Sequence, residues 1–415
     1  MKNNTLKLSA LFSLAISVIL LSCNKANDEN LPVEPVPINI NAEQLSLIES
    51  ENTFAFDIFK KILENSSESE NIIISPLSIS CALSMTLNGA NGTTREAMLE
   101  ALRMNDLTPE IINNSYKDLS KALLTVDKRV LISIANSIWS EKNFEVKVPF
   151  KNILTDYYDA EARSFDITDP LAYQEINSWI EDKTNGLIRN MLSGLDDNTV
   201  MLLVNAIYFK GKWKSQFDKD KTAEKTFYKS DGTTIEVPMM KQVADYKIFS
   251  GEGFVLAEFP YGQGNFVMDV ILPESPNAVN TLTPILNDGS FNGLLDQMHE
   301  RETNLTFPRF KYGFKQGLND ILTDMGMGIA FSDNADFSNI SDMSLLINKV
   351  LHQAFIETNE EGTEAAAATV VEVGTTSAPP EPIVLNIDHS FLYIIRETTT
   401  NAILFMGKVA DPLAN

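Results

Sequence analysis

Apolar positions recur along the chain with two different periods, which predict amphipathic helices and buried strands. Helical spacing of apolar residues covers 54–63 and 173–192. Three further helices are expected to begin at Ser75-Pro76, at Thr93 and at Thr108-Pro109, where an N-cap residue precedes a proline or a capping-box glutamate. Apolar runs typical of strands cover 130–139, 200–209, 237–240, 254–259, 266–272 and 305–310. Because helices and strands are interleaved irregularly, the pattern predicts an α+β fold and not repeating βαβ units.

One segment near the carboxyl end, residues 357–382, departs from this pattern because it contains no lysine, arginine or aromatic residue. Its middle is helix-forming over 364–368 and β-branched over 369–373. At a period of two, one face is small and uncharged and carries Thr363, Ala365, Ala367, Thr369, Val371 and Val373. The segment could therefore enter a β-sheet as a strand without burying a charge on its inner face. The composition of this segment is equally consistent with an alanine- and threonine-rich linker that forms no strand.

Several runs of residues resemble one protein family. Residues 360–369 (EEGTEAAAAT) resemble the hinge of an inhibitory serpin, and residues 388–395 and 405–409 resemble the closing strands of that family. Further blocks resemble the same family in the same order: 71–79 (NIIISPLSI), 204–213 (VNAIYFKGKW), 307–310 (FPRF) and 325–331. Because the blocks are collinear over about 45–412, the chain is identified by resemblance as a serpin.

The resemblance implies both a fold and an activity. The fold would be the serpin fold, with a large central mixed β-sheet, further sheets, about eight to nine helices and an exposed reactive-centre loop at about 357–382. The activity would be inhibition of serine endopeptidases by a suicide substrate, whose loop is cleaved and then inserts into the main sheet. The hinge of this loop would comprise Glu360, Glu361, Gly362, Thr363, Glu364, Ala365, Ala366, Ala367, Ala368 and Thr369.

Small hinge residues favour an inhibitor over the alternative, a non-inhibitory serpin acting as a surface binding or structural lipoprotein. Family spacing from Gly362 places the reactive bond at Thr376-Ser377, with Thr375, Val373 and Glu372 as alternative positions. The segment offers no basic or aromatic residue to a deep specificity pocket. The expected targets are therefore elastase-like or subtilisin-like proteases. Papain-like cysteine proteases are an alternative, and Glu372 would suit a Glu-specific enzyme.

The resemblance also assigns roles to residues in the body of the chain. Ser75, Ser78, Asn205 and His352 would form a buried polar cluster that gates the separation of strands. Trp213 would lie at the top of the sheet, where insertion begins. Taken by themselves, His352 and Trp213 are equally well explained as core residues. No constellation of catalytic residues is recognisable, so the chain is not expected to be an enzyme.

The amino end has the pattern of an export signal. Lys2 and Lys7 precede an apolar run over 8–21 that is short for a membrane span, which predicts a signal peptide at 1–22. Cys23 resembles the cysteine of a bacterial lipobox and is the predicted lipid attachment site, with ordinary secretory cleavage as the alternative. Residues 23–44 would form a lipidated, flexible tether and 45–415 a single serpin domain. The protein is expected to be exported and anchored at a bacterial outer membrane or cell surface.

Charge and cysteine content exclude several kinds of partner. If Cys23 is lipidated, Cys81 remains as a free thiol and no intrachain disulfide can form. Three histidines and one free cysteine argue against a structural metal site. A net charge of −23 argues against nucleic acid and other polyanions. Residues 109–126 correspond to the basic helix with which some serpins bind glycosaminoglycans, yet they offer only Lys117 and Lys121. We expect a monomer with no cofactor and no glycosaminoglycan partner.

Overall fold

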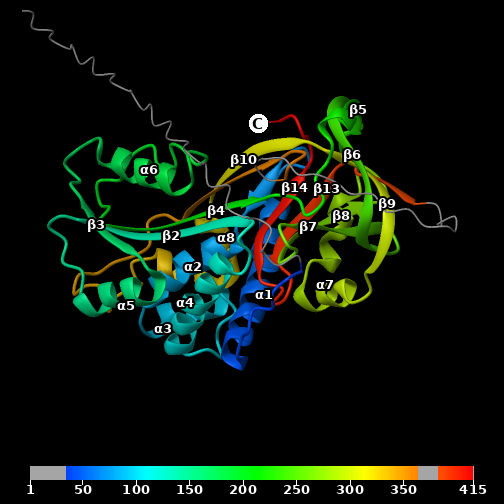
Figure 1. Cartoon of the computed structure of the whole chain (residues 1–415). Helices are drawn as coiled ribbons and strands as arrows, with labels where there is room; N and C mark the ends of the chain where they lie inside the picture. The colour runs from blue at the N-terminus through cyan, green and yellow to red at the C-terminus, as the bar shows by residue number, and fades with distance from the viewer. Residues whose placement is uncertain (1–33, 363–381, 415) are drawn as a thin grey trace, which may run out of the picture. The chain divides into compact units, whose positions relative to one another are not determined.

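The computed structural model describes residues 34–362 and 382–414, which form helices packed on β-sheets (Figure 1). The α-helices in this part of the chain are α1 (Ala42–Asn65), α2 (Pro76–Leu87), α3 (Gly92–Ala101), α4 (Pro109–Thr125), α5 (Val148–Tyr158), α6 (Ala172–Lys183), α7 (Asp288–Leu295) and α8 (Asn319–Leu322). A short 3₁₀ helix, η2 (Lys219–Lys221), precedes β5.

The largest sheet has nine strands and is mixed. Its strands are β1 (Ile72–Ile74), β5 (Ala223–Tyr228), β6 (Thr234–Ser250), β7 (Phe254–Tyr261), β8 (Phe266–Pro273), β9 (His299–Pro308), β12 (Ile383–Asn386), β13 (Phe391–Glu397) and β14 (Ile403–Val409). Eight of them follow the order β1-β14-β13-β8-β7-β6-β9-β12, and β5 pairs with β6. The pair β12 and β9 is parallel, and the other pairs are antiparallel.

Two smaller sheets position the candidate site. The first has the order β3-β2-β4 and is built from β3 (Glu161–Phe165), β2 (Val130–Glu141) and β4 (Met201–Gly211). The second pairs β10 (Phe310–Gly317) with β11 (Leu351–Thr358) in antiparallel register. Helix α2 packs against β4, as Figure 1 also shows.

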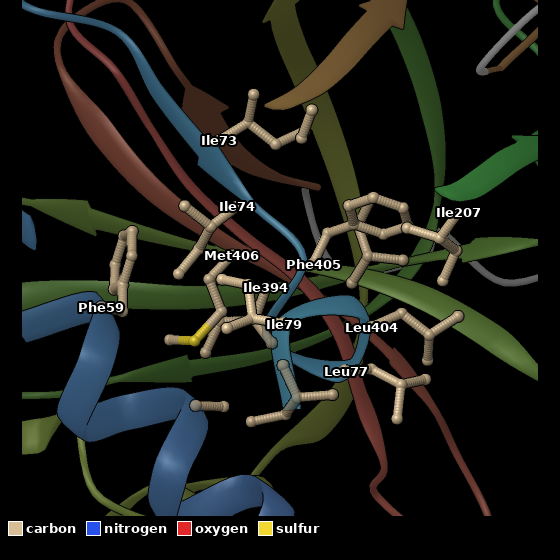
Figure 2. Close-up of a cluster of buried hydrophobic side chains, with 14 of the residues drawn as sticks. Phe59, Ile73, Ile74, Leu77, Ile79, Ile207, Ile394, Leu404, Phe405 and Met406 are labelled. Carbon is tan, nitrogen blue, oxygen red and sulfur yellow. The ribbon is translucent and has the colours of Figure 1, made fainter. Parts of the chain in front are cut away.

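A continuous apolar core joins the helices to the strands. Figure 2 shows Phe59 of α1 and Ile79 of α2 pointing toward Ile394 and Met406 of the central strands. All four side chains are buried. Burying side chains of this size contributes roughly 1.5–3 kcal/mol each, so this core fixes α1 and α2 against the strands.

Two predicted helix starts are confirmed by their caps. Ser75 is the N-cap of α2 and accepts a hydrogen bond from the amide of Ser78, with Pro76 in the first turn. Thr108 caps α4 in the same way through the amide of Ile111. The local sequence therefore decides where these helices begin.

Several predicted elements have different bounds in the structure; the helix predicted at 54–63, for example, is part of the longer α1. Helix α6 ends at Lys183 and not near residue 192, because Asn185 and Gly186 adopt positive φ angles of 51° and 80°. Helix α3 begins at Gly92 with Asn91 as its N-cap and no side-chain capping bond, so Thr93 lies inside the helix and does not form the predicted capping box with Glu96. The predicted strand at 305–310 is divided between β9 and β10.

The ordered body extends N-terminal of the predicted boundary at residue 45. Helix α1 begins at Ala42, where Asn41 and Gln44 form a capping box. Upstream, the Asn265 side chain accepts a hydrogen bond from the amide of Val36 at 2.9 Å and donates one to its carbonyl at 2.7 Å. Residues 34–44 were predicted as part of a flexible tether, but these contacts hold them on the body.

Candidate functional site

Strands β4 and β11 run in the same direction and meet at one end only. Their first residues, 201–205 and 351–353, line one cavity. Beyond their last residues, the amide of Trp213 donates a 3.0 Å hydrogen bond to the carbonyl of Glu361, and Lys212 forms an antiparallel bridge with Gly362. Among the described residues no ladder joins the two strands. A chain returning from the end of β11 would therefore run antiparallel to both strands.

The cavity between these strands has a volume of about 340 Å³. Its wall is largely apolar and includes Ile79, Leu83, Leu202, Val204, Leu345 and Ile347. Gln353 of β11 also lines it, and its Oε1 is buried without a hydrogen-bond partner among the described residues. The cavity is thus bounded by helix α2 and by residues of β4 and β11, of which Gln353 has an unused acceptor.

The structure brings together the four residues predicted to gate the strands. The amide of Ser75 donates to Nε2 of His352 at 3.0 Å, and the hydroxyl of Ser78 donates to the side-chain oxygen of Asn205. The Asn205 amide group in turn donates to Oδ1 of Asn136 on β2 at 2.6 Å. These bonds connect α2 with β4, β2 and β11 across the cavity, so moving β4 away from β11 would disturb them.

Burial determines the charge of His352. Its desolvated side chain has a pKa lowered to about 4, so the imidazole is neutral at neutral pH. A neutral imidazole can accept at Nε2, which is what the Ser75 amide requires. Protonation of His352 would remove this acceptor.

Trp213 closes the opposite end of the two strands. Its indole Nε1 donates to the carbonyl of Asn359 at 2.9 Å, and its ring stacks on Tyr261 with centroids 4.4 Å apart. The side chain is 5% exposed. Trp213 therefore joins β4 to the residues that follow β11.

The chain reverses direction immediately after β11. Asn359 and Gly362 exchange two backbone hydrogen bonds of 3.0 and 3.1 Å, which closes a tight turn. Gly362 has a φ of 127°, and a Cβ at this position would lie 2.2 Å from the carbonyl oxygen of Gly211. Only glycine fits here. The turn places Gly362 between the ends of β4 and β11, directed back along them.

Two hinge glutamates lie inside the structure. Glu360 is 1% exposed and accepts hydrogen bonds from Arg309 and from the hydroxyl of Thr222, and Glu361 is bound by Lys219. Burial raises the pKa of Glu360, but the bonds from Arg309 and Thr222 outweigh it and hold the pKa below its ordinary value. Glu360 is thus an anion that fixes the turn to the end of β9.

These contacts correct the predicted start of the exposed loop. Glu357 and Thr358 belong to β11, and residues 359–362 form the buried turn, so an exposed loop cannot begin at residue 357. The remaining predicted positions lie outside the described residues: Thr363, Glu364, Ala365, Ala366, Ala367, Ala368, Thr369, Glu372, Val373, Thr375, Thr376, Ser377 and Cys23.

Several residues of the site were not predicted from the sequence. Arg309, Lys219 and Thr222 bind the hinge glutamates, and Asn136 extends the polar cluster to β2. Arg309 stands in a block that resembles the family, yet nothing in the sequence pairs it with a residue about fifty positions away.

Within the described ranges, the structure lacks two other kinds of site. No group of three or more histidine, cysteine, aspartate or glutamate residues there could hold a metal ion. Helices in the same ranges are not long and apolar enough to cross a bilayer. Cys81 is buried in α2 as a free thiol.

Comparison with known proteins gives one consistent result. Residues 49–412 match the family model described as serpin, serine protease inhibitor. A serpin-like protein of Thermococcus kodakarensis is 33% identical over 392 residues, which are 92% of this chain and 89% of that protein. Iripin-3 of Ixodes ricinus is 35% identical over 352 residues, which are 83% of this chain and 90% of that protein.

Solved structures share the fold. Human thyroxine-binding globulin in complex with its ligand superposes with a TM-score of 0.82 at 29% identity, covering 90% of this chain and 100% of that one. A cleaved Serpin 42Da superposes with a TM-score of 0.81 at 28% identity, covering the same shares of the two chains. The predicted α+β architecture with a large mixed sheet is thereby confirmed.

Proposed function

Because the chain belongs to the serpin family of serine protease inhibitors, we propose that it inhibits proteases by capturing them on residues 363–381 and inserting the cleaved segment between β4 and β11. The family includes non-inhibitory proteins, so membership supports protease inhibition in general without deciding it for this chain. The proposal is carried by the turn at Gly362, which already bridges to Lys212 at the end where β4 and β11 meet.

The chemistry belongs to the protease. Its serine or cysteine attacks the carbonyl carbon of Thr376, the bond to Ser377 breaks, and Ser377 leaves as a new amino terminus. Thr376 then remains bound to the enzyme through its carbonyl carbon, as an ester of the serine or a thioester of the cysteine. If the segment from Thr363 enters the sheet before water attacks the ester, the enzyme is carried along and its catalytic loop is deformed.

The free energy for this step comes from strand pairing. An inserted strand of about 12 residues spans roughly 40 Å. It would form about 12–20 ladder hydrogen bonds, each with a net contribution of about 0.5–1.5 kcal/mol. The sum is on the order of 10 kcal/mol or more, which exceeds the strain of a distorted catalytic loop.

Residue types in the loop suggest the target class. The stretch 372–378 (EVGTTSA) offers small and β-branched side chains and no basic or aromatic one. Proteases with small specificity pockets, elastase-like or subtilisin-like, fit this sequence best, and papain-like cysteine proteases follow. The same proposal takes Thr376-Ser377 as the reactive bond, with Thr375, Val373 and Glu372 as alternatives.

The proposed location rests on the amino end of the sequence. A signal peptide at 1–22 and lipidation of Cys23 would attach the protein to a bacterial outer membrane or cell surface as a monomer. Globomycin treatment of producing cells tests this directly, because it should leave the signal peptide in place if Cys23 is lipidated.

The alternative is a non-inhibitory binding protein. It is favoured by the structural similarity to thyroxine-binding globulin, which was solved in complex with its ligand. The two hypotheses differ in the fate of the cleaved chain, because a non-inhibitory serpin would be nicked without trapping the enzyme.

A matched pair of variants tests the proposal. The wild-type protein should form an SDS-stable complex with an elastase-like protease. Thr363→Arg puts a charge on the face that would enter the sheet and should convert the inhibitor into a cleaved substrate. Glu364→Arg changes the opposite face and should keep the complex. Cleavage of the wild type without any complex would reject the proposal.

A further inference from the structure

Lysines are concentrated in one stretch of an otherwise acidic chain. Residues 210–229 contain seven lysines and three acidic residues, whereas the whole chain has 56 acidic against 33 basic residues. This stretch spans the end of β4, the 3₁₀ helix η2 and strand β5. It therefore creates a local field opposite in sign to that of the molecule.

The stretch surrounds the turn from which residues 363–381 leave. Trp213 and Phe217 donate backbone hydrogen bonds to the carbonyls of Glu361 and Glu360 at 3.0 and 2.9 Å. Strand β6 also contacts the stretch 210–229, because the side-chain amide group of Gln242 donates to the carbonyl of Ser215 at 3.1 Å. Together with Lys241 and Arg309, the lysines form a basic patch made up of Lys212, Lys214, Lys219, Lys221, Lys241 and Arg309.

Two ion pairs of the patch expose their cations and bury their anions. The Arg309 side chain is 41% exposed while Glu360, its partner, is 2% exposed. Lys219 is 63% exposed while Glu361 is 9% exposed. Lys221 and Lys241 are exposed as well. Exposed acids at this place are Glu34, which pairs with Lys214, Asp218, which pairs with Lys221, and Asp220. The six cations of the patch outnumber these three exposed acids.

We infer that the basic patch is a docking surface for the captured protease and selects enzymes whose active-site rim is acidic. The inference rests on the proposed inhibitory function. Charge complementarity next to the binding segment raises association rates by about 10- to 1000-fold, and the effect is local because charges are screened beyond about 10 Å at 0.1 M salt. A molecule of net charge −23 would otherwise repel such an enzyme.

A protease fits this patch better than a polyanion does. The patch begins where the proposed bait segment begins, at Gly362 and its bridge to Lys212. Arg309 and Lys219 already neutralise the hinge glutamates, which leaves few cations for counterion release along a chain of sulfates or phosphates. A long polyanion would also extend onto the acidic remainder of the molecule.

The test measures association rate constants for two elastase-like proteases of equal small-residue specificity, one with an acidic and one with a basic surface. In the triple variant Lys214→Glu, Lys221→Glu and Lys241→Glu, association with the acidic enzyme should slow by about tenfold at 0.05 M salt. The difference should vanish at 0.5 M salt. Association with the basic enzyme should not slow, and the stoichiometry of inhibition should be unchanged for both enzymes.

A second triple variant controls for total charge. Lys61→Glu, Lys117→Glu and Lys121→Glu change the net charge equally on α1 and α4, and α4 packs against α1, α5 and β2. It should leave the rate with the acidic enzyme within about twofold of wild type. Equal rates for both triple variants, or heparin binding at the patch with unchanged protease rates, would overturn the inference. Failure of the wild type to form a complex with either enzyme would instead reject the proposed function.

Discussion

The backbone amide of Trp213 lies 3.0 Å from the carbonyl oxygen of Glu361, and this hydrogen bond joins two sheets that are otherwise separate along β4 and β11. Glu361 stands one residue before Gly362, where the chain turns back between the strands. The contact thus marks the place where an antiparallel strand would begin to form. The cavity of about 340 Å³ lies at the other end of β4 and β11, where a strand that starts at Gly362 would arrive last.

Substitution of Gly362 should damage this starting point. A Cβ in Gly362→Ala would meet three backbone atoms at 2.2–2.6 Å and would occupy a φ of 127°. We expect the free energy of unfolding to fall by more than about 2 kcal/mol. The fraction of protein cleaved without forming a complex should rise. Thermal unfolding and the stoichiometry of inhibition measure the two effects.

Gly232→Ala is the matched control, because Gly232 has a φ of 82° and no atom within 4 Å of the added Cβ. It should cost about 1 kcal/mol through backbone strain alone and leave the stoichiometry unchanged. An equal effect of the two substitutions would show that the contact with Gly211 has no role in the hinge.

Acidification should destabilise the contact between α2 and β11, because it protonates His352, which accepts the hydrogen bond of the Ser75 amide. Burial lowers the pKa of His352 from 6.5 to about 4. The contribution of the neutral imidazole to the free energy of unfolding is therefore fully present above pH 6.5 and is lost as the pH falls through 4. At pH 5 the loss is on the order of 2 kcal/mol. Spontaneous loss of the active form should therefore be faster at pH 5 than at pH 7.5.

His352→Gln separates this effect from general acid denaturation. The glutamine does not titrate, so the rate of inactivation should depend less on pH between 5 and 7.5 than in the wild type. Identical pH profiles for the two proteins would exclude His352 as the responsible group.

A buried acid in α1 should produce the opposite pH dependence. Burial raises the pKa of Glu51 from 4.5 to about 7, in spite of hydrogen bonds from Ser80 and Tyr116. The stabilising contribution of the neutral acid is complete below pH 4.5 and is lost as the pH rises through 7. Glu51→Gln should therefore be more stable than the wild type at pH 8, by up to about 3 kcal/mol.

Denaturant unfolding at pH 5 and pH 8 measures the effect of Glu51→Gln. The stability difference between the variant and the wild type should be larger at pH 8 than at pH 5. A constant difference would mean that Glu51 does not change its charge in this range.

The sequence predicted the elements that depend on local signals. The starts of α2 and α4 follow from Ser75-Pro76 and Thr108-Pro109, whose side chains cap the helix within three residues. The end of α6 was missed because apolar spacing continues to Met191, while the backbone at Asn185 and Gly186 leaves the helical region. Periodicity reports which positions are apolar and does not report where the backbone turns.

Long-range pairing could not be predicted in the same way. Arg309 reaches Glu360, and Asn265 reaches Val36, over separations that no local pattern encodes. The buried turn at 359–362 was predicted as exposed loop because the whole segment 357–382 lacks lysine, arginine and aromatic residues. In the structure, ion pairs with Arg309 and Lys219 keep its glutamates inside. Glu360 and Glu361 can be buried because the fold brings basic side chains to them, and no local sequence pattern predicts these ion pairs.

Thermal unfolding of the intact chain and of the chain nicked near Thr376 tests the central claim most directly. If the segment after Gly362 pairs between β4 and β11 once it is cut, a gain on the order of 10 kcal/mol should raise the melting temperature by about 10 °C or more. An equal or lower melting temperature after cleavage would contradict the account.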